Sequence, residues 1–216
     1  MRKLLFLSWN YGVRKMIAIV DYKAGNLKSV EKAMLLLGQK VLVTSSPEEI
    51  LSADKVILPG VGAFGDAMKN LTAEGLDAVL CQVAEKGTPL LGICLGMQLL
   101  FEGSEESPGV KGLGLLPGFV LRIPSCPGLK IPHMGWDNLQ ISKGMRLYDS
   151  IPDGSYVYFV HSYYLKAENP SQVSARCEYG VSIDASVEAG NIFGCQYHPE
   201  KSGDVGLRIL SNFASI

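Results

Sequence analysis

Short apolar segments alternate with amphipathic ones over the first half of the chain. Residues 16–21 form a continuous apolar run that ends in an acid, which is typical of a parallel strand covered on both faces. Apolar residues then recur at helical spacing from Leu27 to Leu37, with Asn26 as a candidate cap and Gly38 as the stop. The same alternation predicts strands at 41–43, 55–58 and 89–93, and helices from Pro47, over 75–86 and over 95–101. Strands alternating with helices predict an α/β fold with a doubly wound, mostly parallel sheet and helices on both faces.

The pattern changes in the second half of the chain. From Gly118 to Gln196, short strands and turns follow one another without helices between them. The expected strands are 119–123, 156–160, 173–178, 181–187 and 192–196, and a last helix covers 203–213. We therefore expect an antiparallel or mixed C-terminal extension of the sheet, within a single domain of residues 16–216. Residues 1–15 are interpreted as an N-terminal extension, with Met16 as the functional start.

Composition narrows the class of protein. The chain has 216 residues, of which 47% are hydrophobic, and this is enough for one large core. Its net charge of −1 and its lack of a Lys/Arg run give no indication of a nucleic-acid surface, and no apolar segment is long enough to cross a membrane. The five cysteines are odd in number and lack metal-ligand spacing, so we expect a reducing cytoplasm, no disulfide framework, no metal and no cofactor.

A candidate nucleophile lies in the turn Gly92-Ile93-Cys94-Leu95-Gly96, which joins a buried strand to a helix. Such a turn lifts the central side chain out of the sheet, and small flanking residues let the backbone come close. The helix N-terminus favours thiolate over thiol, and the Leu95 amide is a candidate oxyanion donor. The alternative is a buried, apolar cysteine with glycines that serve packing, and the turn alone does not decide between them.

A candidate base follows the last predicted strand, in His198-Pro199-Glu200. Residues two apart at a strand end point to the same side, so the Glu200 carboxylate can orient the His198 imidazole. The alternative is a surface turn. A second glycine turn, Pro59-Gly60-Val61-Gly62, follows the third strand and would lie at the same edge of a parallel sheet. Its amides are candidates for a second oxyanion donor, although an ordinary tight turn has the same composition.

Together these motifs resemble the class I, triad-type glutamine amidotransferases. The general resemblance rests on residues 92–98 and 198–200. A narrower resemblance is to the glutaminase subunits of imidazole glycerol phosphate synthases. It rests on Asp21-Tyr22, Gly25-Asn26-Leu27 and the segments 58–64, 132–136, 159–164 and 196–202. The resemblance covers nearly all of residues 16–216, departs at Lys23, where the family usually has a small residue, and has no counterpart for residues 1–15.

The resemblance implies that glutamine is hydrolysed to glutamate and ammonia. Cys94 would be the nucleophile, His198 the acid and base, and Glu200 its orienting carboxylate. The oxyanion hole maps onto Leu95 and onto Gly60, Val61 and Gly62. Glutamine binding maps onto Gly62, Gln98, Glu106, His161, Ser162 and Tyr163. Glu106 would take the α-amino group, with a solvated acidic face shared with Glu102 and Glu105 as the alternative.

The resemblance also implies a heterodimer. Ammonia would pass to a (β/α)₈-barrel cyclase subunit that makes imidazole glycerol phosphate and aminoimidazole carboxamide ribotide in histidine biosynthesis. Lys201, Tyr158 and Trp136 are the expected interface residues. The loop at Pro59–Gly62 is expected to switch an amide into the oxyanion hole when the partner holds its substrate, so Gly60→Ala or Gly62→Ala should disturb activity more than folding.

Three other functions remain open at this point. One is the glutaminase subunit of another synthase, serving guanylate, anthranilate or vitamin B6 synthesis. Another is a catalytically silent subunit that binds and regulates a partner. The third is a stand-alone cysteine hydrolase, which would hydrolyse glutamine rapidly without any partner.

Overall fold

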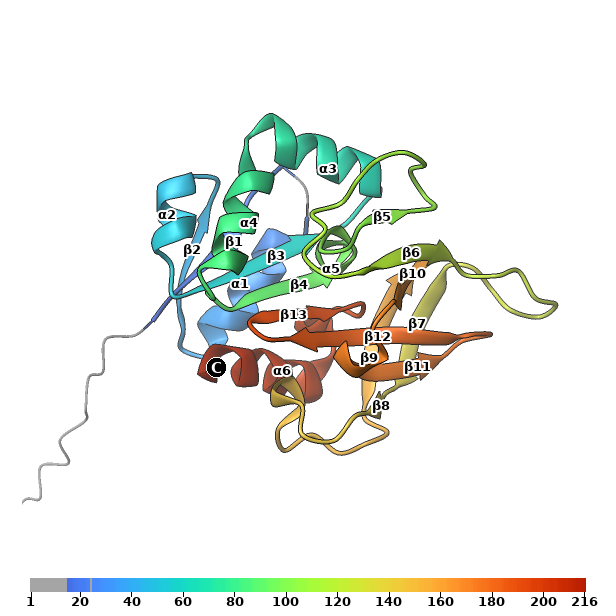
Figure 1. The fold of residues 1–216 in the computed structure, drawn as a ribbon. Coiled ribbons are helices and arrows are strands. Elements are labelled where there is room, and N and C mark those ends of the chain that lie inside the picture. The colour runs from blue at the N-terminus through green and yellow to red at the C-terminus, as the bar shows by residue number, and fades with distance from the viewer. Residues whose placement is uncertain (1–14, 24) are drawn as a thin grey trace, which may run out of the picture.

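An eight-stranded sheet runs through the centre of the computed structural model, which describes residues 15–23 and 25–216 (Figure 1). Its order is β2-β1-β3-β4-β13-β12-β11-β8. The parallel strands are β2 (Lys40–Thr44), β1 (Met16–Val20), β3 (Lys55–Gly60), β4 (Leu90–Cys94) and β13 (Ile192–Cys195). The antiparallel extension consists of β12 (Ser182–Ala189), β11 (Val173–Glu178) and β8 (Gln140–Ile141). The predicted fold class is confirmed, while the predicted N-terminal extension lies outside the described residues except for Lys15.

Helices cover both faces of this sheet, because its central strands are apolar on both sides. In β1, Ala18 and Val20 belong to one hydrophobic cluster, and Ile17 and Ile19 belong to the other. The first cluster also contains side chains of α2 (Pro47–Ser52), α3 (Phe64–Ala73), α4 (Leu76–Glu85) and α5 (Leu95–Leu99). The second contains those of α1 (Leu27–Leu36) and α6 (Gly203–Ser215) (Figure 1). No helix in the described part of the chain is long and apolar enough to span a membrane.

Two strands expected in the main sheet belong to smaller sheets instead. One small sheet has the order β10 (Tyr163–Ala167), β6 (Gly118–Arg122), β5 (Gly103–Ser104). The other pairs β7 (His133–Asn138) with β9 (Tyr156–His161). The physical reason is their patterning: β9 buries only every second residue, as a strand with one face on the core does, whereas β4 is buried throughout. The remaining short elements are the 3₁₀ turns η1 (Arg146–Tyr148), η2 (Pro170–Gln172) and η3 (Pro199–Lys201).

The sheet brings the predicted motifs to one edge. Gly60 at the end of β3 is in register with Cys94 at the end of β4. Ile93 is in register with Cys195, three residues before His198. The carboxyl ends of β3, β4 and β13 therefore meet, as expected for ligand sites in open parallel sheets.

Candidate active site

Cys94 lies in a strained turn between β4 and α5. Its φ of 54° and ψ of −112° fall outside the regions that L-residues ordinarily adopt. The flanking glycines make the turn possible: a Cβ on Gly92 would lie 2.7 Å from the Met97 backbone, and one on Gly96 would lie 1.8 Å from the Leu58 carbonyl oxygen. Backbone strain of this kind persists mainly at functional sites, which favours a reactive role over simple packing.

His198 is held by contacts on both sides. Its Nδ1 donates to Glu200 Oε1 over 2.8 Å, and its backbone N–H donates to the Tyr158 carbonyl over 3.0 Å. Because Glu200 accepts at Nδ1, the neutral ring carries its free lone pair on Nε2, which is buried without a hydrogen-bond partner. Asn26 Nδ2 also donates to Glu200 Oε1, over 3.2 Å. Asn26 was expected to cap α1, but its side chain makes no cap hydrogen bond to the helix backbone.

The neighbours of His198 favour its charged form. Burial lowers its pKa, but the negative charges of Cys94 and Glu200, together with the hydrogen bond to Glu200, outweigh burial. The net result raises the pKa from 6.5 to about 9. At neutral pH the ring is therefore an imidazolium that can stabilise a thiolate at Cys94 and donate a proton to a leaving group.

A pocket of about 440 Å³ opens in front of these residues. It is lined by ten of the predicted residues, namely Val61, Gly62, Cys94, Leu95, Gln98, Glu106, His161, Ser162, Tyr163 and His198, and also by Pro132 and Val160. Glu200 does not line it and lies behind His198. Gly60 is also absent from the lining: a Cβ there would lie 2.6 Å from Tyr22 Oη and 2.8 Å from the Gly96 nitrogen.

Gln98 and Gln196 form a buried amide pair beside Cys94. Gln98 Nε2 donates to the Tyr163 carbonyl over 3.0 Å and to Gln196 Oε1 over 2.9 Å. Gln196 Nε2 in turn lies 3.8 Å from Cys94 Sγ as a donor. Both Gln98 protons are thus used, which leaves its Oε1 as an acceptor for a ligand. Gln196 was not among the predicted site residues, although its position two residues before His198 in an extended segment places both side chains on the same side.

Glu106 differs from the neighbouring acids Glu102 and Glu105 in its hydrogen-bond partner. Its Oε2 accepts the N–H of Phe64, at the start of α3, over 2.8 Å, and the carboxylate faces the pocket. Glu102 and Glu105 instead accept backbone N–H groups of Gly118 and Arg122 at β6. The alternative of one shared acidic face is therefore not supported, and Glu106 alone of the three lines the pocket.

His161 is a neutral wall of the pocket. Its Nδ1 lies 2.9 Å from the Tyr163 carbonyl, and its Nε2 lies 3.2 Å from His133 Nδ1. Burial lowers the pKa of His161 to about 3, so it does not carry charge near neutral pH. This agrees with a binding role and not with a base role.

The expected interface residues lie on the β7–β9 sheet and on η3, which directly follows His198. Trp136 is 54% exposed and meets Tyr158 edge to face at 6.1 Å between ring centroids. Met134 and Tyr156 are exposed on the same small sheet. Lys201 is exposed at the end of η3. The structure thus brings Trp136 and Tyr158 together as part of an exposed apolar face.

Comparisons with known proteins agree on one family. The family model described as glutamine amidotransferase class-I matches residues 18–215. The imidazole glycerol phosphate synthase subunit HisH of Moorella thermoacetica is 52% identical over 200 residues, covering 93% of this chain and 94% of that protein. The subunit of the same name from Bacillus cytotoxicus is 51% identical over 203 residues, covering 93% and 95%. The solved structure of PurLQS from Thermotoga maritima has the same fold, with a TM-score of 0.73, 22% identity, and coverage of 94% and 98%.

Proposed function

This chain belongs to the class I glutamine amidotransferase family, and we propose that it is the glutaminase subunit of an imidazole glycerol phosphate synthase. It releases ammonia from glutamine for histidine biosynthesis. The observation that carries the proposal is the convergence of Cys94 and His198 on one pocket, with Glu200 bonded to His198 behind it. Relatives of the imidazole glycerol phosphate synthase kind, at about half identity over nearly the whole chain, support this subunit over those of other synthases.

In the proposed mechanism, the Cys94 thiolate attacks the side-chain amide carbonyl of glutamine. The oxyanion is held by the Leu95 amide, whose position at the start of α5 leaves it without an acceptor inside the helix. The His198 imidazolium gives its Nε2 proton to the departing ammonia, and the neutral ring then activates water against the thioester. Glu200 keeps the other ring nitrogen protonated throughout, which holds the ring in the productive tautomer.

The proposed glutamine site uses the polar groups that remain free in the pocket. The Glu106 carboxylate pairs with the α-ammonium group, and Gln98 Oε1 accepts a further hydrogen bond. Gly62, Ser162 and Tyr163 line the same wall, and His161 contributes as a neutral ring. A second oxyanion donor comes from the Gly60–Gly62 loop, where Gly62 has a φ of 106° and open space around its Cα. This backbone conformation and the open space beside it support a loop that can rotate one of its peptide N–H groups into the oxyanion hole.

The proposed partner is a (β/α)₈-barrel cyclase that docks on the exposed face of β7 and β9. Trp136, Tyr158 and Lys201 are the proposed contacts, because exposed aromatic side chains on a surface next to His198 are typical of interface anchors. Docking there encloses the pocket and channels ammonia away from water. The five cysteines are all free, which supports the proposed cytoplasmic location.

A labelling experiment with a partner assay tests the proposal. The chain is purified with a candidate barrel subunit, and glutamate release is measured with and without the nucleotide substrate. A glutamine-analogue affinity label should modify Cys94, and Cys94→Ala should abolish both labelling and glutamate release. The control Cys126→Ser removes an exposed cysteine and should change neither. No labelling of Cys94 even in the complex would support a silent regulatory subunit, and rapid turnover without a partner would support a stand-alone hydrolase.

A further inference from the structure

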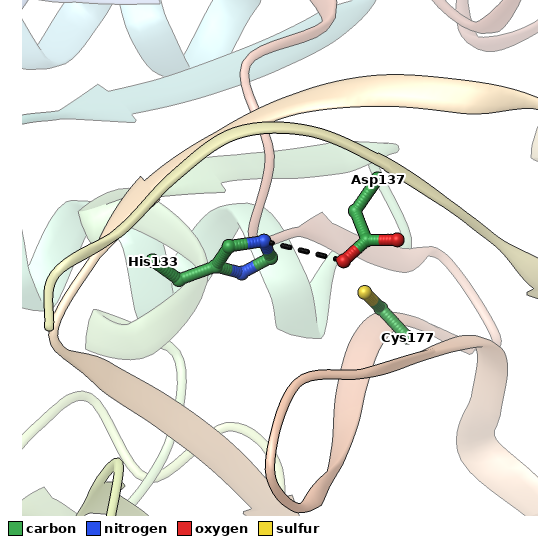
Figure 2. Close-up of side chains that lie close together, drawn as sticks. All are labelled: His133, Asp137 and Cys177. Atoms are coloured by element: carbon green, nitrogen blue, oxygen red, sulfur yellow. Dashed lines mark ion pairs between the residues drawn. The ribbon is translucent and has the colours of Figure 1, made fainter. Parts of the chain in front are cut away.

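Three side chains outside the pocket point toward one another between β7 and β11. His133 and Asp137 come from β7, and Cys177 comes from β11 (Figure 2). His133 Nε2 lies 3.5 Å from Asp137 Oδ2, and the nitrogen, oxygen and sulfur atoms all lie within 4.8 Å of one another. His133 and Cys177 are buried, while the Asp137 side chain is 28% exposed and gives access from solvent.

The hydrogen bonds around His133 determine which of its nitrogens carries the proton. The Tyr163 carbonyl can only accept, so His161 Nδ1 is the donor in that bond. Neutral His161 then presents a lone pair at Nε2, and His133 Nδ1 must donate to it. With the proton of the neutral ring on Nδ1, His133 Nε2 is left with a free lone pair.

That lone pair faces a carboxylate. Asp137 Oδ1 accepts the N–H of Asn138, whereas Oδ2 is directed at His133 Nε2. Two acceptors 3.5 Å apart repel each other unless a proton or a cation lies between them. Cys177 adds a third donor atom on the same side, and burial together with Asp137 raises the pKa of its thiol.

We propose that His133, Asp137 and Cys177 form a binding site for Zn²⁺. A nitrogen, an oxygen and a sulfur donor are the three ligand types that zinc accepts, and tetrahedral ligands at zinc bond lengths lie roughly 3.3 to 3.7 Å apart. The distance between His133 Nε2 and Asp137 Oδ2 already lies in this range. Small side-chain rotations would bring Cys177 Sγ, which lies within 4.8 Å of both atoms, to the same distance. Zinc displaces the thiol proton to solvent, and two anionic ligands then balance the charge of the buried ion. A water completes the fourth position on the exposed side of Asp137.

The surroundings of His133 are those of a metal-binding histidine. Its ring is stacked between Phe159 and Tyr179, at centroid distances of 4.7 and 3.8 Å, so its orientation is restrained before any ion arrives. Its second nitrogen is bonded to His161, as ligating histidines require. The chain spacing of these residues gave no indication of a metal site, because Cys177 is 40 residues beyond Asp137 and only the fold brings them together.

The test is zinc binding by the full chain in a Cys94→Ser background, which removes the competing thiol beside His198. Calorimetry with Zn²⁺ should give one ion per chain, with about one proton released as Cys177 ionises. Cobalt substitution should give a sulfur-to-metal absorption band that Cys177→Ala removes. Asp137→Asn should weaken binding by more than about tenfold, since even outer partners of metal ligands typically cost 10–100-fold. Cys126→Ser, which removes a distant exposed thiol, should leave stoichiometry and spectrum unchanged.

Two results would overturn the proposal. One is the absence of stoichiometric zinc binding, with His133 instead titrating as an imidazolium paired with Asp137. The other is binding that survives both Asp137→Asn and Cys177→Ala. Asp137→Asn keeps the shape of a partly exposed side chain, so it remains informative if the buried Cys177→Ala variant does not fold.

Discussion

The contact between Glu200 and His198 leads to a prediction about the pKa of His198, which one substitution tests. Glu200→Gln keeps the size of the side chain and an oxygen that accepts from His198 Nδ1, but it removes the negative charge. Both side chains are almost fully inaccessible to solvent, so the charge acts with little screening. We expect the pKa of His198 to fall from about 9 by one to three units, the range that a close opposite charge typically produces.

The size of the effect follows from the raised pKa of His198. A rise from 6.5 to about 9 corresponds to roughly 3 kcal/mol of preference for the imidazolium in the folded protein. Because the folded pKa is above the unfolded one, this stabilisation is complete below about pH 6.5 and is lost as pH rises through about 9. Glu200→Gln should therefore lower the free energy of unfolding at acidic to neutral pH, and the difference from the parent should shrink above about pH 9.

Ring-proton NMR is the direct assay, because the chain has only three histidines. Burial lowers the pKa of His133 and holds that of His161 at about 3, so a resonance that titrates above neutral pH belongs to His198. Glu106→Gln is the matched control, since its carboxylate lines the pocket but bonds to the Phe64 amide. A parent His198 that titrates near 6.5, or a Glu200→Gln titration that equals the parent, would refute the reasoning.

Two further predictions concern the loop and the exposed face. Gly60→Ala should lower the melting temperature strongly, because its Cβ would clash with Tyr22 Oη and the Gly96 backbone. A Cβ on Gly62 meets no atom within 4 Å, so the cost of Gly62→Ala in stability is limited to the strain of its φ of 106°, and it should mainly reduce partner-stimulated glutamate release. Equal melting shifts would contradict this. Trp136→Ala should weaken association with the barrel subunit by about 2 kcal/mol or more in a titration, with little change in melting temperature, while Leu36→Ala, exposed on α1, should change neither.

The parallel half of the fold was predictable because its strands are buried on both faces. Such strands appear in the sequence as uninterrupted apolar runs, and glycines mark the helix ends. Helix α3 was not predicted although Phe64, Ala67, Met68 and Leu71 have helical spacing, because its N-cap residue, Ala63, has no side chain that could cap a helix. The two small sheets were not separable from the main one, since alternation shows that a strand has one buried face but not which neighbour it pairs with.

For the pocket, the local motifs were predictable but the long-range hydrogen bonds were not. Cys94, His198 and Glu200 lie in short segments whose residue types indicate their chemistry. Asn26 reaches Glu200 across 174 residues of chain, and Gln196 reaches Cys94 across 102. The contact of Asn26 has no sequence signal, because an amide side chain at a helix start serves capping equally well. The position of Gln196, two residues before His198, indicates the side to which it points but not its partner.

Hydrogen bonds of the backbone also connect His198 to the exposed face of β7 and β9. The backbone N–H of His198 donates to the carbonyl of Tyr158 in β9. The Tyr158 N–H in turn donates to Ser202 Oγ over 3.0 Å. Ser202 Oγ then donates back to the His198 carbonyl over 2.7 Å, which closes a ring of three hydrogen bonds. Because Tyr158 also contacts Trp136, we expect a subunit that docks on Trp136 and displaces β9 to move His198 with it. We therefore expect docking and the position of His198 to be coupled through one short segment of strand, independently of any movement in the glycine loop.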